Sequence, residues 1–335
     1  MTTPALTTPA RPFQHRHAAH CESGVAANLF THYGAPLSEA MAFGLSSALS
    51  FAYLPFIKLT GFPLIAYRMP PRFILKGLRK PFNVRLHFET FVTPQQGQLR
   101  LDQLLQQGRV VGLQTSVFWL PYFPQDMRFH FNAHNLLVYG KEGDDYLISD
   151  PVAEEPQRCA SADLQRARFA KGTLAPKGLL YYPDTPRRKA PSASAVRQAI
   201  IKTTRIMVGP IPLVGVRGMR MLANKIDKLQ ADEYGLNFIG HIVRMQEEIG
   251  TGGAGFRFLY ASFLQEAATL CALPSLELLA ERLNSIGDDW RSFALQAVRM
   301  IKGRDPVNFA ALAAALRALA AQEREFFLAL RQAVQ

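Results

Sequence analysis

A proline-rich basic segment at residues 183–194 divides this 335-residue chain into two parts with different hydrophobic periodicity. The segment holds three prolines and three consecutive basic residues, a composition typical of a linker. A chain of this length is expected to form about two domains. We therefore predict a domain over residues 15–183, a linker over 184–194 and a second domain over 195–335, after a loose Thr/Pro-rich N-terminus at residues 1–14.

The first part mixes helical and strand-like patterns. Apolar residues at spacings of three and four predict helices over residues 21–32 and 37–51. Strand-like runs follow at 86–92, 110–116, 135–139, 146–149 and 179–182, and the loop at 140–145 predicts a hairpin between the third and fourth runs. Helices followed by a mostly antiparallel sheet predict an α+β domain.

The second part has helical periodicity throughout. We expect helices over residues 194–207, 217–229, 232–249, 255–272, 275–301 and 308–334, which together make an all-α domain. A glycine-rich run lies at residues 250–255 and follows a helix. Phosphate-binding loops of the dinucleotide type follow a strand, so a helix C-cap and tight turn explain this run better.

The net charge of +12 comes from two segments. Residues 68–85 hold six basic residues and no acidic one, and residues 187–228 hold ten basic residues and one acidic one. No helix-turn-helix, zinc-finger or RNP pattern accompanies them, so we do not expect nucleic acid as a partner. Solubilising surface charge, docking of an acidic protein or phosphorylated ligand, and contact with a membrane surface stay open.

Cysteine content and hydropathy place the chain in a reducing compartment. Its three cysteines are far apart and form neither a disulfide framework nor a paired CxxC zinc motif. The N-terminus lacks the apolar core of a signal peptide, and the apolar stretch at residues 41–57 is too short and too polar to span a membrane. We expect a cytoplasmic protein without stable membrane insertion.

Cys21 begins the first predicted helix, where the helix dipole and unpaired backbone N–H groups favour a thiolate. His134 precedes one strand of the predicted hairpin and Asp150 follows its partner, so the two lie at the same end of the hairpin. This order fits a Cys–His–Asp triad. Taken singly, each residue also fits an ordinary buried position.

Metal binding is a competing interpretation of the same region. His15, His17, His20, Cys21, His130 and His134 could supply ligands. None of them shows the HExxH or paired-CxxC spacing of the well-known zinc motifs. We therefore expect neither a metal nor a bound cofactor.

Several short motifs match a known family pattern: His20-Cys-Glu-Ser23, Leu37-Ser-Glu39, Phe43-Gly44, Ala133-His-Asn135, Ser149-Asp-Pro151 and the run from Gly250 to Ala267. With these motifs the chain resembles the butirosin biosynthesis protein H family and the helical domain that commonly accompanies it. The resemblance implies a papain-like cysteine-protease-type N-terminal domain followed by an all-α domain. It further implies an acyltransferase that takes an acyl group from the phosphopantetheine thioester of an acyl carrier protein and passes it to an amine.

By position in the family pattern, Cys21 would be the nucleophile, His134 the base and Asp150 the group that orients the base. Papain-like enzymes often place a Gln about six residues before the Cys, whereas this chain has His15 there and Gln14 one residue earlier. The backbone N–H of Cys21 is therefore the safer oxyanion donor. The oxyanion and supporting candidates are Gln14, His15, His20 and Glu22.

Two further groups of residues are predicted to bind substrates. Arg257, Tyr260 and Glu266 are candidates for lining the acyl or acceptor pocket, with helix packing as the alternative for Tyr260. Carrier proteins are typically acidic, and the predicted docking residues are Arg68, Arg72, Lys76, Arg79, Lys80 and Arg85. The carrier protein would bring its own phosphopantetheine arm.

The predicted function is thus amide formation in natural-product biosynthesis through a Cys21 acyl-enzyme. A thioesterase or cysteine peptidase with the same triad remains an alternative, as does a non-catalytic scaffold that binds carrier proteins. The acyl chain, the acceptor amine and the oligomeric state stay open, and a homodimer is one option for the last.

Overall fold

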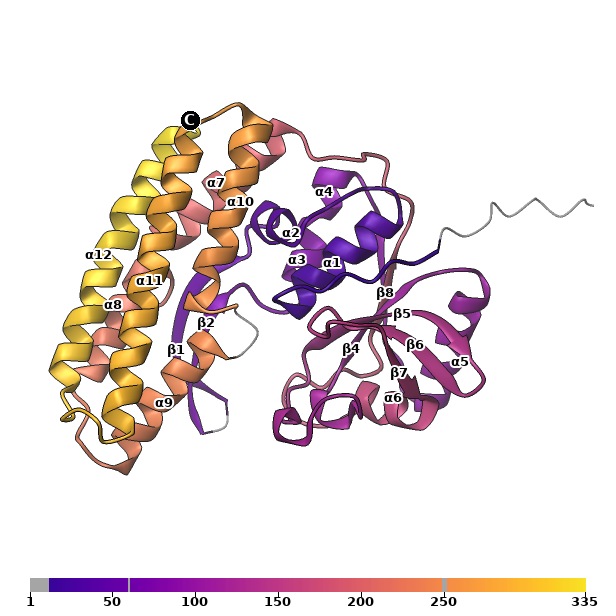
Figure 1. Cartoon of the computed structure of the whole chain (residues 1–335), viewed down its shortest axis with the longest axis horizontal. Helices are drawn as coiled ribbons and strands as arrows, with labels where there is room; N and C mark the ends of the chain where they lie inside the picture. Colours follow the sequence, from indigo (N-terminus) through magenta and orange to yellow (C-terminus); the bar gives the residue numbers. More distant parts are fainter. Residues whose placement is uncertain (1–11, 60, 249–251) are drawn as a thin grey trace, which may run out of the picture. The chain divides into compact units, whose positions relative to one another are not determined.

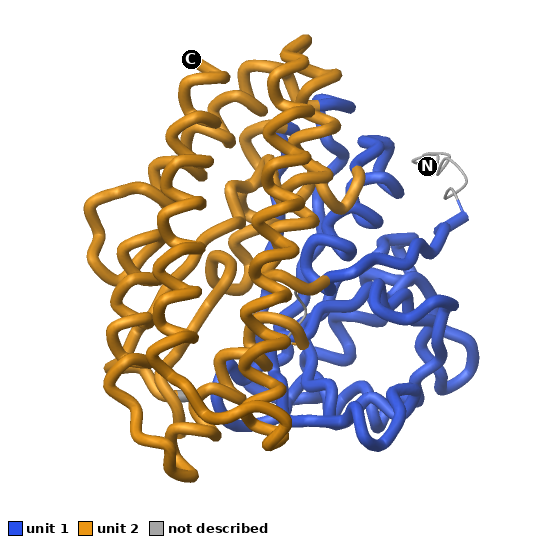
Figure 2. Tube along the Cα trace, turned by 60° about the vertical axis from the view of Figure 1, so that its left-hand side comes forward, with its two compact units in different colours: residues 1–37, 82–190 blue, residues 38–81, 191–335 orange. Residues whose placement is uncertain are grey.

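The computed structural model describes residues 12–59, 61–248 and 252–335. These residues form two compact units, each assembled from two separate stretches of the chain (Figure 2). The first unit combines the described residues up to 37 with residues 82–190, and the second combines residues 38–81 with 191–335. The predicted loose N-terminus falls mostly on residues 1–11, which lie outside the described residues.

The first unit is built on one six-stranded antiparallel sheet (Figure 1). Its strands lie in the order β3 (Leu86–Glu89), β8 (Leu180–Pro183), β4 (Val111–Thr115), β5 (His134–Glu142), β6 (Asp145–Ser149) and β7 (Gln157–Ala160). The helices of this unit are α1 (Cys21–His32), α5 (Pro94–Gln106) and α6 (Ser161–Arg168), with single turns of 3-10 helix at Val117–Trp119 and Gln125–Met127. The predicted antiparallel sheet and α+β class are confirmed, whereas α5, α6 and β7 were not predicted.

Side-chain alternation along the strands gives the sheet two different faces. Val111 and Leu113 of β4 belong to the apolar cluster that also includes Leu101 of α5 and Leu164 of α6. Gly112, between them, points the other way, and a Cβ there would lie 2.0 Å from the Tyr181 ring. α1 packs against β5. The sheet is therefore sandwiched between α1 on one face and α5 with α6 on the other (Figure 1).

The second unit consists mainly of six long helices. They are α7 (Ala193–Met207), α8 (Gly215–Ile226), α9 (Glu233–Glu247), α10 (Arg257–Cys271), α11 (Ser275–Ile301) and α12 (Phe309–Ala333), preceded at α10 by a 3-10 turn at Ala254–Phe256. The helical character predicted for this part of the chain is confirmed. Its remaining elements are α2 (Glu39–Leu45), a hairpin of β1 (Leu49–Leu59) and β2 (Phe62–Arg68), α3 (Phe73–Gly77) and α4 (Arg79–Phe82), the last of which ends at the boundary between the units.

The structure corrects the predicted domain boundaries for residues 38–81. These residues were assigned to the N-terminal domain, yet they pack with the C-terminal helices. Phe43 of α2 stacks on Phe256 with ring centroids 4.9 Å apart, and a Cβ at Gly44 would lie 2.0 Å from the Phe263 ring. Residues 38–81 are far in sequence from the C-terminal helices, so no local sequence pattern predicts that the two pack together. The second boundary, after residue 190, does fall inside the predicted linker.

The predicted helix over residues 37–51 is wrong in its second half. The helix ends at Leu45, and β1 begins at Leu49. Between them Ser47 has a φ of 58°, in the left-handed region that interrupts a helix. Its hydroxyl donates to the carbonyl of Ala199 at 3.1 Å, so a tertiary hydrogen bond holds the turn in place.

A buried ion pair lies in the core of the helical unit. Arg257 Nε donates to Glu323 Oε1 at 2.8 Å and Arg257 Nη2 donates to Oε2 at 3.0 Å, with both side chains fully buried. The indole N–H of Trp290 donates to the same carboxylate at 2.7 Å, and the Arg257 guanidinium lies 5.1 Å from the Trp290 ring centroid. α10, α11 and α12 are therefore joined by one polar network.

We predict that Glu323→Ala destabilises the chain by about 3–5 kcal/mol, because it leaves the buried Arg257 charge uncompensated. The matched control is Glu325→Ala. Glu325 lies on α12, as Glu323 does, but it is exposed and pairs with Arg282, so its removal should lower the free energy of unfolding by less than about 1 kcal/mol. Urea unfolding of the full chain measures both free energies of unfolding. Equal losses for the two variants would show that the buried network does not stabilise this unit.

Candidate active site

Cys21 is the first residue of α1 and is 5% exposed. His20 precedes it in an extended conformation and caps the helix, since its Nδ1 accepts the Ser23 N–H at 3.3 Å. The first amide groups of a helix have no partner inside the helix, and the positive end of the helix dipole points toward them. The Cys21 sulfur therefore lies where an anion is stabilised.

A close approach of backbone to backbone brings the start of α1 to the segment that follows β6. Ala18 N–H donates to the carbonyl of Pro151 at 2.7 Å. A Cβ at Gly24, in the first turn of α1, would lie 2.6 Å from Cβ of Pro151. Only a glycine leaves room for this contact, which holds the start of α1 against the residue that follows Asp150.

His134 and Asp150 form a buried hydrogen-bonded pair. His134 is the first residue of β5, Asp150 follows the last residue of β6, and the two strands are paired with Leu137 opposite Ser149. His134 Nε2 lies 2.6 Å from Asp150 Oδ2, and the side chains are 5% and 0% exposed. The hairpin thus brings the two residues together as its sequence predicts.

Two donors hold the Asp150 carboxylate in addition to His134. The Tyr122 hydroxyl donates to Oδ2 at 2.8 Å, and the Val152 N–H donates to Oδ1 at 3.2 Å. Burial and the Asp150 charge raise the pKa of Tyr122 well above its ordinary value, so the phenol stays a donor. Phe123 covers the imidazole edge-on, with ring centroids 5.6 Å apart. No sequence signal marks Tyr122 or Phe123 for this role.

Burial alone would lower the pKa of His134, but the Asp150 charge and hydrogen bond, together with hydrogen bonding to Cys21, raise it to about 10. Because Nε2 is bound to Asp150, Nδ1 is the ring nitrogen that remains for the sulfur. The thiol, imidazole and carboxylate therefore follow one another in the order of a cysteine triad.

Tyr181 of β8 is a further neighbour of the cysteine. Burial and the charges of Glu22 and Cys21 raise its pKa well above the ordinary value. Its hydroxyl donates to Asn135 Oδ1 at 2.9 Å. The buried Glu22 therefore lies near Tyr181 in the interior of the unit.

Two of the predicted oxyanion candidates, His15 and His20, have hydrogen-bond partners of their own. Both ring nitrogens of His15 are engaged, Nδ1 with the Ser149 hydroxyl at 2.8 Å and Nε2 with the Ala153 carbonyl at 3.0 Å. His20 Nδ1 is bonded to Ser23. His15 and His20 thus fix backbone segments around the site, and the Cys21 backbone N–H is the better-placed donor.

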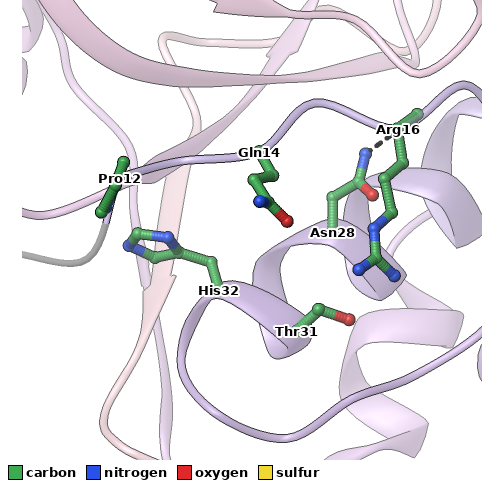
Figure 3. A pocket seen from close by; sticks show the side chains of 6 residues that line it. All are labelled: Pro12, Gln14, Arg16, Asn28, Thr31 and His32. Atoms are coloured by element: carbon green, nitrogen blue, oxygen red, sulfur yellow. Dashed lines mark hydrogen bonds between the residues drawn. The ribbon is translucent and has the colours of Figure 1, made fainter.

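Gln14 lies at the opposite end of α1 from Cys21. It lines a small pocket of about 40 Å³ together with Arg16, Asn28, Thr31 and His32 (Figure 3). Asn28 Nδ2 donates to the Arg16 carbonyl there at 2.9 Å. Ten residues of helix separate Thr31 from Cys21, roughly 15 Å along the axis. Gln14 is therefore ruled out as an oxyanion donor in this conformation.

The predicted substrate-binding residues of α10 serve packing. Arg257 is buried against Glu323, and Tyr260 is fully buried, so neither presents surface to a substrate. Glu266 is half-buried and accepts the Ser38 hydroxyl at 2.7 Å. The prediction that Arg257 and Tyr260 line a pocket is wrong, and helix packing, the alternative for Tyr260, is what the structure shows.

The predicted docking residues divide between the two units. Arg68, Arg72, Lys76, Arg79 and Lys80 belong to the helical unit, whereas Arg85 belongs to the sheet unit. All except the half-buried Arg68 are exposed. Among the described residues, Arg72, Lys76, Arg79, Lys80 and Arg85 form no salt bridge, whereas Arg68 Nη1 donates to the Met69 carbonyl at 3.0 Å.

Neither a metal cluster nor a membrane-spanning helix is present among the described residues. Within the described residues, no three His, Cys, Asp or Glu side chains cluster as a metal site. His130 instead stacks on Phe118, with ring centroids 4.1 Å apart. Over the same residues, no helix is both long and apolar enough to cross a bilayer.

Comparison with known families places the chain. Residues 20–151 match the model described as butirosin biosynthesis protein H, N-terminal, and residues 162–330 match a domain of unknown function, DUF4872. The chain belongs to the butirosin biosynthesis protein H-like family. Its N-terminal domain is α+β, with Cys21 at a helix start and the His134–Asp150 pair at one end of a hairpin of the sheet.

A crystal structure of a candidate C39-like peptidase from Bacillus anthracis is similar over 52% of this chain and 96% of its own, at 11% identity and a TM-score of 0.36. No match was found among curated proteins.

We predict that Asp150→Asn lowers the pKa of His134 from about 10, because the variant loses the carboxylate charge and hydrogen bond that oppose the effect of burial. A raised histidine pKa stabilises the fold below pH 6.5, and this stabilisation is lost as the pH rises through about 10. The variant should lack that loss. NMR titration of the His134 ring protons and unfolding at several pH values measure the two effects.

Asp184→Asn provides the matched control. It removes a carboxylate that lies 2.9 Å from His87 Nε2 at a more exposed position of the same unit. The titration of His134 should not change in this variant. An unchanged His134 pKa in Asp150→Asn would contradict the electrostatic account of the site.

Proposed function

We propose that the chain is a cysteine-dependent acyltransferase that moves an acyl group from an acyl carrier protein thioester to an amine in natural-product biosynthesis. The observation that carries this proposal is the combination of Cys21, at the start of α1, with the hydrogen-bonded pair of His134 and Asp150 at one end of the β5–β6 hairpin. The match to a biosynthesis protein H model supports the biosynthetic setting.

The first step loads the enzyme. With a pKa of about 10, His134 holds a proton at neutral pH, and Cys21 supplies it as the sulfur becomes a thiolate. The thiolate attacks the carbonyl carbon of the donor thioester, and the Cys21 N–H stabilises the oxyanion. The donor C–S bond then breaks, the pantetheine sulfur takes the proton from His134, and an acyl-enzyme remains.

The second step transfers the acyl group. The amine nitrogen attacks the acyl-enzyme carbonyl, and its proton passes to His134 Nδ1 as the Cys21–acyl bond breaks. An amide leaves, and the thiolate–imidazolium pair is restored. Exchange of a thiol with a thioester is nearly balanced in energy, whereas amide formation is favourable, so the second step draws the reaction forward.

Asp150 acts by holding His134. Its carboxylate fixes the imidazole orientation and stabilises the imidazolium, as the 2.6 Å contact and the raised pKa of His134 indicate. The same three groups could instead pass the acyl group to water. Hydrolysis and transfer differ only in the acceptor, so product analysis with and without an amine separates them.

We predict that incubation with an acyl-loaded carrier protein adds the mass of one acyl group to the enzyme, and that Cys21→Ala abolishes this adduct. Asp150→Asn should slow its formation about 100-fold or more. Intact-protein mass spectrometry measures the adduct with a panel of acetyl, butyryl and octanoyl carrier proteins.

The matched control is Cys159→Ala, because burial raises the pKa of that thiol to about 12 and keeps it unreactive. It should retain the adduct. A wild-type enzyme without any adduct, or an adduct that persists in Cys21→Ala, would refute acyl transfer through Cys21.

A basic patch of the helical unit is proposed to dock the carrier protein. Lys202 of α7 lies 4.8 Å from the ring centroid of Phe73 in α3. This contact brings the second basic segment beside the first. The patch comprises the exposed residues Arg72, Lys76, Arg79, Lys80 and Lys202. Opposite charge on an acidic carrier protein would speed its encounter with such a patch.

We predict that replacing Arg72, Lys76, Arg79 and Lys80 with Gln lowers the rate of acyl loading about tenfold at low salt and flattens its salt dependence. Stopped-flow or quenched loading at 20 and 300 mM salt measures both quantities. Lys302→Gln with Arg304→Gln, also exposed in the helical unit, is the control and should load normally. Equal effects of the two sets would argue against a docking patch.

A further inference from the structure

The sheet unit has a second, larger pocket that the proposed chemistry does not use. Its volume is about 580 Å³, within the range of small-molecule sites. Two loops line it, one at residues 90–92 and one at 169–177. Phe91, Phe169, Lys171 and Lys177 supply its aromatic and charged lining.

The pocket lies at the same edge of the sheet as His134. Residues 90–92 follow the end of β3, and the loop at 169–177 leads to the start of β8, where Glu89 pairs with Leu180. Thr115, at the end of β4, pairs with His134 at the start of β5. Two to three strand spacings, roughly 10–14 Å, therefore separate the pocket from His134.

Two buried side-chain amides, those of Gln114 and Asn132, hold the loop at residues 169–177 to the sheet edge where His134 lies. Gln114 Nε2 donates to the Asn132 carbonyl at 2.8 Å and to the Leu174 carbonyl at 3.1 Å. Asn132 Nδ2 donates to the carbonyls of Lys171 and Thr173 at 3.1 and 2.9 Å. Asn132 stands two residues before His134, so the loop has a defined position relative to the imidazole.

The aromatic lining is also fixed in place. Phe91 packs on the apolar core, and its N–H donates to the Lys177 carbonyl at 3.1 Å. The Phe169 ring lies against Gly97 and Gly178, where a Cβ would come within 2.8 and 2.3 Å of it. The φ of Gly178 is +67°, a conformation that glycine adopts readily. The aromatic lining is therefore held by its surroundings before any ligand arrives.

The pocket also carries positive charge from two lysines. Lys171 and Lys177 are exposed, and among the described residues neither forms a salt bridge. Two uncompensated ammonium groups beside apolar rings suit a ligand with an aliphatic stem and an anionic end. Phosphate and carboxylate both have this chemistry.

We propose that this pocket binds the anionic end of a substrate, a phosphate or a carboxylate, and directs the reacting end along the sheet edge toward Cys21. This rests on the proposed acyl transfer, because it assigns part of a substrate of that reaction. The anion belongs either to the pantetheine phosphate of the donor or to a carboxylate on the acceptor amine. The separation of roughly 10–14 Å fits a linear chain of several bonds in either case.

Paired substrates test the proposal and identify the source of the anion. The donor pair is the acetyl thioester of pantetheine 4′-phosphate and that of unphosphorylated pantetheine. The acceptor pair is 6-aminohexanoate and hexylamine. In Lys171→Gln/Lys177→Gln, KM should rise about tenfold for the anionic member of one pair and stay constant for its neutral counterpart. Lys189→Gln, another exposed lysine of this unit, should change neither.

Binding without turnover separates this inference from the proposed function. Calorimetry with the Cys21→Ala protein measures the affinity of pantetheine 4′-phosphate and of 6-aminohexanoate. Loss of about tenfold in affinity in the lysine variant supports the pocket even if no acyl-enzyme forms. Equal affinity in both proteins, no binding of either compound, or equal KM changes for charged and neutral substrates would overturn the inference while leaving acyl transfer intact.

Discussion

The buried hydrogen bond between His134 and Asp150 is the interaction on which the candidate active site depends. A carboxylate and an imidazole taken out of water need partners for their remaining hydrogen-bonding groups. The Tyr122 hydroxyl and the Val152 N–H are further donors to the Asp150 carboxylate, and the Cys21 side chain is the second hydrogen-bond partner of the His134 imidazole. The pair thus fixes the hairpin of β5 and β6, the loop that carries Tyr122 and the start of α1 relative to one another. Removing any one of these contacts leaves a buried polar group without that hydrogen-bond partner.

The antiparallel sheet explains why so many functional features meet at one edge. Strand ends alternate along an antiparallel sheet, so the end of β4, the start of β5 and the end of β6 lie side by side. The end of β3 and the start of β8 continue the same edge and carry the larger pocket. α1 brings its N-terminus to this edge because Gly24 allows it to pass close to Pro151. Cys21, His134 and the candidate substrate pocket are therefore brought to one edge by the topology of the sheet.

Much of the active edge could be predicted from the sequence because its signals are local. The helix at residues 21–32 and the hairpin that joins His134 to Asp150 both follow from short-range patterns. What could not be predicted depends on contacts between distant positions. Residues 38–81 pack with the C-terminal helices, Arg257 pairs with Glu323, and Gln14 lies near Thr31 instead of Cys21. Periodicity and spacing contain no information about such partners, and the family pattern for Gln14 assumed a chain path that this N-terminal segment does not follow.

Chemical competence of an isolated acyl-enzyme is the most direct test of the central claim, that Cys21 carries an acyl group from donor to amine. The enzyme would be loaded from an acyl carrier protein, freed of the donor by gel filtration and mixed with an amine. The account predicts that amide appears in proportion to the acyl-enzyme consumed, and faster than the acyl-enzyme decays in buffer alone. An acyl-enzyme that decays only to the free acid, at one rate with or without amine, would contradict it.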